Sequence, residues 1–565
     1  MKNQAKWWQS AVFYQIYPRS FADGNGDGIG DLKGIIQKLD YLQNLGIDAI
    51  WLSPHFPSPY VDCGYDVSDY RGVAPEYGTI EDFKEFLRGA HERGIRVVLD
   101  LVLNHTSEQH AWFQESRMDK TNPKRDWYIW KSTENGEPPN NWYSTFGGSA
   151  WELDPATNQY YYHYFFKEQP DLNWKNLEVW EAMFNEARFW LDMGVDGFRL
   201  DAVGTIFEDE RYDNRPETMT QEGLFRLSHE AKNEEMNAEV LKYWMEIFHR
   251  QVDQPEVHQV TRALRNVIDE YEDRVLIGET DDIAFYGDND NELHLNFNFP
   301  LMRTPKITAD HVRNNQKTRL AALPSWAWPC NTLGNHDSAR VINNFGDGKN
   351  NELQARLYIM LLLTLKGTPF LYNGEEIGMS DLVISDPKLF RDPLGTLFYG
   401  WAKSELGLSE DEAIQVGAGR GRDKCRTPMQ WKNEVNGGFS PTGITPWLPV
   451  NPDYSAGVNV ADQAKNPESL FAFYQKVLTT RKNSKALTLG EFELIAGQPK
   501  EVLYYTRTFE NEIVSMLLNM DSKTQSIKLN PEVKIKKILL INTQKIEEGT
   551  LNQMTLLPYQ GIVFI

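Results

Sequence analysis

The chain contains 565 residues, 41% of them hydrophobic and 24% charged, and carries a formal net charge of −22 at pH 7. A chain of this length exceeds one compact domain and accommodates a large core with appended domains. The acidic balance argues against nucleic acid as a partner, because binding to phosphate backbones requires a basic surface. It is compatible with a protein that acts on neutral ligands.

The first ten residues contain Lys2 and Lys6 but no apolar segment, so we expect no signal peptide, and no stretch is long enough for a membrane span. The chain has three cysteines, an odd number, and they lie far apart in the sequence: Cys63, Cys330 and Cys425. A disulfide framework is therefore not expected, and the composition favours a cytoplasmic protein.

Eight short apolar segments alternate with helical patterns over the first four-fifths of the chain, as expected for βα units. They lie at residues 12–17, 49–53, 97–104, 197–202, 275–279, 294–298, 331–335 and 369–372. Eight such strands predict an α/β protein with a closed (β/α)₈ TIM barrel. Several segments end in polar residues, at the end of the barrel where such enzymes keep their catalytic groups: Asn104-His105, Asp201, Glu279, Asn335-His336-Asp337 and Glu375.

Two stretches interrupt the alternation. Residues 105–174 are rich in Trp, Tyr, Asn and Gly without a clear helical period, which predicts an irregular inserted domain after the third strand. Residues 487–565 contain short strand-like segments and predict a C-terminal antiparallel β-sandwich. We therefore assign residues 1–104 and 175–486 to the barrel. The C-terminal segments are 491–494, 502–507, 513–518, 527–529, 538–541 and 562–565.

A glycine-rich loop near the N-terminus has the spacing of a cation site. Asp23, Asn25 and Asp27 place side-chain oxygens at alternate positions, the Ile29 carbonyl occupies the seventh position, and Asp31 follows. Calcium loops of the EF-hand type use this spacing, but their twelfth position holds a glutamate, and here that position is Gly34. We expect a structural hard cation rather than an EF-hand. An Asx/Gly turn without metal is the alternative.

Three carboxylates are candidates for catalysis. Arg199 and Asp201 lie two positions apart on one predicted strand, so their side chains share a face and the guanidinium would keep the carboxylate ionised. Glu279 ends an apolar strand, where burial would raise its pKa and suit a general acid. Asp337 has an imidazole beside it. Each could instead be a satisfied polar residue, but together they supply the carboxylate pair that glycoside cleavage needs.

These segments resemble the α-amylase superfamily, glycoside hydrolase family thirteen, over nearly the whole chain. The signature blocks are Asp100-Leu-Val-Leu-Asn104-His105, Gly197-Phe-Arg199-Leu-Asp201, Glu279 within Ile-Gly-Glu-Thr, and Asn335-His336-Asp337. The resemblance implies that Asp201 is the nucleophile, Glu279 the general acid/base and Asp337 a stabiliser of the transition state. It also implies a glucose subsite completed by His105, Arg199 and His336. The loop of Asp23, Asn25, Asp27, Ile29 and Asp31 matches the family's Ca²⁺ or Mg²⁺ site, and no organic cofactor is implied.

Finer motifs resemble the α-glucosidase and oligo-1,6-glucosidase branch. Gln169-Pro-Asp-Leu-Asn173 is similar to its signature, and Asp62 and Tyr65 match residues that hold the non-reducing glucose. In the family, that aspartate pairs with an arginine, for which we favour Arg426 and keep Arg422 as the alternative. Such a pair would close the pocket and explain exo action. Phe146 and Phe165 match aromatic residues of the pocket wall, although both could be ordinary core residues.

The linkage preference is inferred from two small residues. The family's α-1,6-cleaving enzymes tend to have Val after the nucleophile, whereas here that residue is Ala202, and Gly334 precedes Asn335. By resemblance these residues favour maltose-type α-1,4 linkages in maltose and malto-oligosaccharides, with sucrose or isomaltose as possible further substrates. A small pocket change is worth only about 1–3 kcal/mol, so mixed specificity stays open.

Other activities on the same fold provide the alternatives. They are an oligo-1,6-glucosidase, a sucrose isomerase or trehalose synthase, and a non-catalytic transporter-associated relative. The isomerases carry an Arg-Leu-Asp-Arg type loop after the general acid, which is absent between Glu279 and His336. The non-catalytic relatives would have a membrane span and would lack the carboxylates. We expect neither a nucleic-acid nor a membrane partner.

Overall fold

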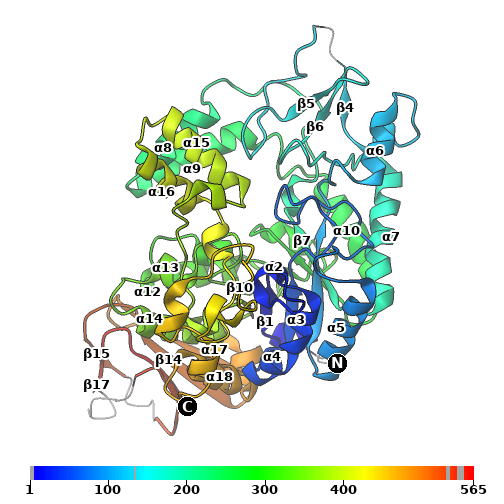
Figure 1. Ribbon diagram of the computed structural model, residues 1–565. Coiled ribbons are helices and arrows are strands. Elements are labelled where there is room, and N and C mark those ends of the chain that lie inside the picture. Colours follow the sequence, from blue (N-terminus) through cyan, green and yellow to red (C-terminus); the bar gives the residue numbers. More distant parts are fainter. Residues whose placement is uncertain (1–4, 133–134, 530–534, 544–552) are drawn as a thin grey trace.

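The computed structural model describes residues 5–132, 135–529, 535–543 and 553–565 (Figure 1). Its central element is a parallel eight-stranded sheet in the order β10-β11-β1-β2-β3-β7-β8-β9. A single parallel bridge from Phe297 to Cys330 joins the two ends of this sheet and closes the barrel. The predicted (β/α)₈ barrel and all eight predicted strands are confirmed. Their bounds are β1 (Phe13–Ile16), β2 (Ala49–Leu52), β3 (Arg96–Val102), β7 (Gly197–Asp201), β8 (Val275–Gly278), β9 (Leu295–Asn296), β10 (Cys330–Thr332) and β11 (Thr368–Tyr372).

The register of three neighbouring strands brings the candidate carboxylates to one edge of the barrel. Val102 at the end of β3 pairs with Asp201 at the end of β7, and Leu200 pairs with Gly278 at the end of β8. Glu279 follows directly, and its backbone N–H donates to the Leu200 carbonyl at 3.0 Å. The strands are buried on both faces, which explains their continuous apolar runs.

Helices surround the barrel, and local signals set their ends. Thr79 and Asp82 form a capping box at the start of α5 (Ile80–Glu92). Gly194, with φ of 107°, ends α7 (Leu177–Met193) in the left-handed conformation that glycine adopts readily. The other main helices of this layer are α3 (Leu32–Gln37), α4 (Leu39–Leu45), α10 (Val257–Ile268), α12 (Ala309–Ala322), α14 (Asn351–Thr364) and α18 (Leu470–Lys482). None of the described helices is long and apolar enough to cross a membrane.

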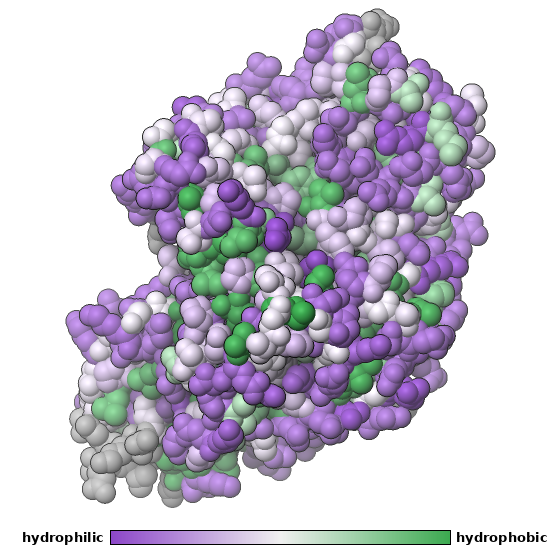
Figure 2. Space-filling model, in the orientation of Figure 1, coloured by the Kyte–Doolittle hydropathy of each residue, from purple (hydrophilic) through white to green (hydrophobic). Residues whose placement is uncertain are grey.

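Two lobes stand above the carboxyl-terminal edge of the barrel (Figure 1). One follows β3 and contains a helix and a three-stranded sheet in the order β4-β6-β5. The other consists of four helices from two chain segments far apart in sequence; α8, α15 and α16 pack around Phe225, Ala402 and Ala413, and α9 packs against α8. Apolar residues gather in the recess between the lobes, visible in Figure 2. The elements are α6 (Ala111–Met118), β4 (Trp130–Lys131), β5 (Trp151–Asp154), β6 (Gln159–Tyr162), α8 (Gln221–Glu230), α9 (Glu234–Phe248), α15 (Pro393–Ser404) and α16 (Glu410–Arg420).

The C-terminal part is antiparallel, as predicted. Its main sheet has the order β12-β13-β14-β18-β16, and β15 pairs with β17 in a second sheet. One face of the main sheet joins the barrel core through Leu503 and Tyr505, and the other face packs towards β15 and β17 through Tyr504 and Leu517. The strands are β12 (Glu491–Leu494), β13 (Val502–Phe509), β14 (Glu512–Asn519), β15 (Gln525–Lys528), β16 (Ile538–Ile541), β17 (Gln553–Leu556) and β18 (Gly561–Phe564). The sequence pattern did not predict β17.

Candidate active site

A single buried guanidinium connects three carboxylates at the barrel edge. Arg199 donates from Nη1 to Asp201 Oδ1 and to Asp100 Oδ1, both at 2.6 Å. Its Nη2 lies 2.9 Å from Glu279 Oε2, and the guanidinium stacks over the Trp51 ring at 4.9 Å. Asp100, on β3, is completely buried and also accepts from Trp51 Nε1 at 2.8 Å. The arrangement fixes Asp201 and Glu279 relative to each other through one planar group.

The residue after Asp201 also binds Glu279. The Ala202 backbone N–H donates to Glu279 Oε2 at 2.8 Å. Ala202 has φ of 40° and ψ of 43°, a left-handed conformation that is uncommon for a residue with a Cβ. Thr205 Oγ1 donates to the Ala202 carbonyl at 2.8 Å and stabilises this turn. The turn therefore directs one backbone donor at the second carboxylate.

Burial and crowding change the proton affinity of this cluster. Burial raises the pKa of Asp201 well above its ordinary value, and Glu279 and Asp100 raise it further, whereas Arg199 lowers it. Burial raises the pKa of Asp100 to about 6 against the opposing effect of Arg199. Asp100 and Asp201 share one cation, so both hold a proton more readily than isolated carboxyl groups do.

Asp337 lies beside two guanidinium groups and a neutral imidazole. Burial lowers the pKa of His336 to about 3, so its ring is uncharged at neutral pH. Gln15 Nε2 lies 2.7 Å from His336 Nδ1, and Tyr65 Oη lies 2.6 Å from Nε2. Although burial alone would raise the pKa of Asp337, pairing with His336, Arg426 and Arg422 lowers it below its ordinary range.

Arg422, not Arg426, pairs with Asp62. The distance from Arg422 Nη2 to Asp62 Oδ1 is 2.8 Å, so the preference for Arg426 was wrong. Asp392 orients Arg422, because it accepts hydrogen bonds from Arg422 Nη2 at 2.8 Å and from the Arg422 backbone N–H at 2.6 Å. Arg426 is completely buried and binds Asp337 Oδ1 at 2.5 Å. The motif spacing alone did not reveal that Asp392 selects between the two arginines.

His105 lies directly behind the pocket wall. Its Nε2 is 3.2 Å from the Tyr65 carbonyl and 2.9 Å from the Gln169 amide nitrogen, which in turn donates to Asp62 Oδ2 at 3.2 Å. Burial lowers the pKa of His105 to about 4. The Phe165 ring meets the His105 ring edge-on, with centroids 5.1 Å apart. The predicted Gln169 motif thus lies against the Asp62 end of the pocket.

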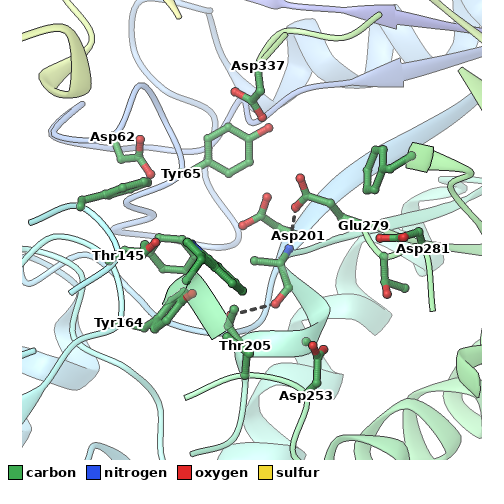
Figure 3. Close-up of a pocket in the computed structure, with 18 of the residues that line it drawn as sticks. Asp62, Tyr65, Thr145, Tyr164, Asp201, Thr205, Asp253, Glu279, Asp281 and Asp337 are labelled. Carbon is green, nitrogen blue, oxygen red and sulfur yellow. Dashed lines mark hydrogen bonds between the residues drawn. The ribbon is translucent and has the colours of Figure 1, made fainter. Parts of the chain in front are cut away.

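A cavity of about 460 Å³ opens above these groups (Figure 3). The predicted residues that line it are Asp62, Tyr65, Phe146, Phe165, Asp201, Ala202, Glu279 and Asp337. Arg199, His105, His336 and Arg426 contact these residues from behind. Arg422, the alternative partner of Asp62, also lines the cavity. Further lining residues were not singled out because they lie on loops and short helical segments without a motif: Thr145, Tyr164, Thr205, Trp244, Asp253, Asp281, Phe299 and Arg303.

The predicted cation loop is closed by its own hydrogen bonds. Asp23 accepts from the backbone N–H groups of Gly26 and Gly28, and Asp31 accepts from those of Gly24, Asn25 and Gly34. Within the described residues, no three His, Cys, Asp or Glu side chains are grouped as metal ligands. A hard cation here would therefore need the Asn25 amide and the Ile29 carbonyl as well as the carboxylates, all of them oxygen donors. The metal site stays a prediction.

Comparison with known proteins places this geometry in a family. Residues 15–490 match the α-amylase catalytic domain. An oligo-1,6-glucosidase of Parageobacillus thermoglucosidasius is 39% identical, covering 99% of this chain and 98% of the relative. A trehalose-6-phosphate hydrolase of Bacillus subtilis (strain 168) is 36% identical, covering 99% and 98%. The crystal structure of the trehalulose synthase from Pseudomonas mesoacidophila MX-45 superposes with a TM-score of 0.87 at 36% identity and 99% coverage of both chains.

Proposed function

Because the chain belongs to the α-amylase family of glycoside hydrolases, we propose that it is an exo-acting retaining α-glucosidase. It would remove the terminal non-reducing glucose from short α-glucosides such as maltose and malto-oligosaccharides. The observation that carries the proposal is the pair Asp201 and Glu279, held by Arg199 beside a pocket that the Asp62–Arg422 ion pair closes. Two carboxylates on one guanidinium favour the short separation, about 5–5.5 Å, that retaining enzymes use.

In the proposed first step, an Asp201 oxygen attacks the anomeric carbon while the bond to the leaving oxygen breaks. Glu279 gives its proton to that oxygen, so the leaving group departs as a neutral alcohol and a glucosyl ester forms on Asp201. Glu279 then takes a proton from water, which displaces Asp201 and releases glucose with its original anomeric configuration. The Ala202 N–H and Arg199 would orient Glu279 and stabilise it when it is ionised.

The closed half of the pocket is suited to one glucose unit. Asp337 would accept hydrogen bonds from glucose hydroxyls, because its pairing with Arg426 keeps it ionised. Tyr65 and Phe165 line the wall, where aromatic faces pack on the apolar face of a sugar ring. Asp62 and Arg422 are 2.8 Å apart across the end, so a longer chain could not pass through, which supports exo action.

The linkage preference depends on Ala202. Its small side chain supports the proposed preference for α-1,4 linkages, because it leaves room beside Glu279. An oligo-1,6-glucosidase is the second candidate, favoured by the name of the Parageobacillus relative. Isomerisation of sucrose is the third, suggested by the trehalulose synthase structure. We further propose a cytoplasmic location and a structural Ca²⁺ or Mg²⁺ at the loop of residues 23–31.

The decisive experiment measures glucose release from maltose, isomaltose, sucrose and trehalose, with the first product anomer followed by NMR. We expect α-glucose to appear first and maltose to be cleaved fastest. Initial β-glucose would refute the retaining mechanism, and sucrose isomers formed without glucose release would favour the isomerase.

Replacing the nucleophile provides the complementary test. Asp201→Asn should reduce kcat by at least about 10⁴-fold, because the amide cannot form the glucosyl ester. Circular dichroism and the melting temperature should stay close to those of the wild type. Substantial residual turnover by the folded variant would show that Asp201 is not the nucleophile.

A further inference from the structure

The catalytic pair divides the pocket into two halves (Figure 3). Asp62, Tyr65 and Asp337 lie on one side of Asp201 and Glu279, and this side ends in the Asp62–Arg422 ion pair. On the opposite side the cavity continues in what we call the outer half, lined by Thr205, Asp253 and Asp281, with Arg303 and Phe299 beside Asp281. If the closed half holds the glucose, as in the proposed function on which this inference rests, the outer half holds the leaving group.

The outer half carries an excess of negative charge. Its cationic side chain, Arg303, lies 3.3 Å from Asp281 and stacks over the Phe299 ring at 4.7 Å. Arg303 therefore balances the negative charge of Asp281, and Asp253 adds a second negative charge to the outer half. Burial raises the pKa of Asp253, the negative charges of Asp282 and Asp281 raise it further, and His258 opposes them. His258 Nδ1 lies 2.8 Å from Glu292 Oε2.

Asp253 is held firmly in this position. Its backbone has φ of 53°, in the left-handed region, and its N–H donates to the Gly204 carbonyl at 2.7 Å. A Cβ on Gly204 would lie 2.4 Å from Asp253 Oδ1, so the carboxylate packs directly on the turn that follows the nucleophile. Gly204 and the Asp253 side chain thus fit together closely.

We propose that Asp253 and Asp281 make the outer half selective for neutral, hydroxyl-bearing leaving groups and exclude those that carry a phosphate. Carboxylates accept hydrogen bonds from sugar hydroxyls. A phosphate in the same place would meet the like charge of these two carboxylates. Asp253 is then a specificity-determining residue for the leaving group.

The test compares a disaccharide with its phosphorylated counterpart. The kcat/KM of the full-length protein is measured for maltose and maltose 1-phosphate, and for isomaltose and isomaltose 1-phosphate. In the wild type we expect the phosphorylated form of the preferred disaccharide to react at least about 30-fold more slowly. Asp253→Asn should reduce the ratio of kcat/KM for the neutral disaccharide to that for its phosphorylated form by at least about fivefold. Asp253→Asn/Asp281→Asn should reduce this ratio further, because the second change also frees Arg303 to pair with the phosphate.

Two controls separate charge from shape and from misfolding. Asp288→Asn removes a negative charge from an exposed side chain that lies on the neighbouring loop and does not line the cavity. It should leave the ratio of kcat/KM for the neutral and phosphorylated disaccharides unchanged. For the unaltered protein, raising the salt concentration from about 20 mM to about 500 mM should also narrow the gap by screening the repulsion.

Comparable rates for the two members of a pair would overturn the inference, and so would a gap that persists in the double variant and at high salt. Failure of the wild type to release glucose from maltose, isomaltose or sucrose would overturn the proposed function and this inference with it.

Discussion

Ala202 combines two functions in one residue, because its backbone orients Glu279 while its side chain lines the pocket. Ala202→Val would bring a β-branched side chain into a left-handed turn and narrow the space beside the cleaved bond. We expect a lower kcat on maltose and an increase of about tenfold in the isomaltose-to-maltose ratio of kcat/KM. Ala202→Gly is the matched control, since it relieves the backbone and widens the pocket. An unchanged ratio in the valine variant would show that Ala202 does not set the linkage.

The charge cluster around Arg199 should determine the acid side of the pH profile. In the proposed mechanism Asp201 must be ionised to attack. Burial together with Glu279 and Asp100 raises its pKa, so kcat/KM should fall as the pH drops through this raised value. Asp100→Asn removes one negative neighbour and leaves Arg199 freer to pair with Asp201. Both effects lower the pKa of Asp201, so the acid limb should move to lower pH. A limb that stays in place, or moves to higher pH, would contradict this account.

Among the structural elements, the loop of residues 23–31 offers a direct test of the predicted cation. Gly28, with φ of 95°, packs against the Thr445 carbonyl, and its own carbonyl accepts from the Trp447 N–H at 2.9 Å. A cation in this loop would therefore stabilise its contact with a distant segment. Treatment with EDTA should lower the melting temperature by several degrees, and Ca²⁺ or Mg²⁺ should restore it.

The same measurement on variants identifies the ligands. Asp27→Asn should abolish the response to added cation, whereas Asp119→Asn, in an exposed loop outside residues 23–31, should retain it. A melting temperature that is insensitive to chelator in the wild type would leave the loop as an Asx/Gly turn stabilised by hydrogen bonds alone.

Elements differ in how well the sequence predicts them. The barrel strands could be predicted because burial on both faces produces continuous apolar runs, and the carboxylates could be placed because they follow those runs. The pattern failed for α8 and α9, which lie outside the eight βα units, although α9 contributes Trp244 to the pocket. It also failed to choose between Arg422 and Arg426, because the choice depends on Asp392, which is distant in sequence. Tertiary contacts of this kind leave no local signal.

At the scale of the whole molecule, Arg507 connects the C-terminal sheet to the barrel. It is completely buried and donates to the carbonyls of Thr364, Leu365 and Gly490 at 2.8–3.2 Å. Burial and the nearby Arg481 lower its pKa to about 9. Arg507→Ala would remove this donor from two carbonyls at the end of α14 and from that of Gly490, at a cost of about 1–3 kcal/mol each.

We therefore expect Arg507→Ala to lower the melting temperature by at least several degrees and to separate the calorimetric transition into two, since the two parts would unfold less cooperatively. The exposed Arg88→Ala, which loses only a weak surface ion pair, is the control and should melt like the wild type. A single unshifted transition for Arg507→Ala would show that the apolar contacts alone hold the two parts together.

The closure of the barrel at Phe297 and Cys330 has a kinetic consequence. Seven of the eight junctions between neighbouring strands are continuous ladders, whereas this junction has one bridge and the bond from the Asn298 N–H to the Cys330 carbonyl at 3.0 Å. Transient opening should therefore begin here, and the amide protons of residues 295–298 should exchange with deuterium faster than those of β3 or β7. Cys330 is fully buried at this seam, so the rate at which its thiol reacts with a maleimide would report the opening directly.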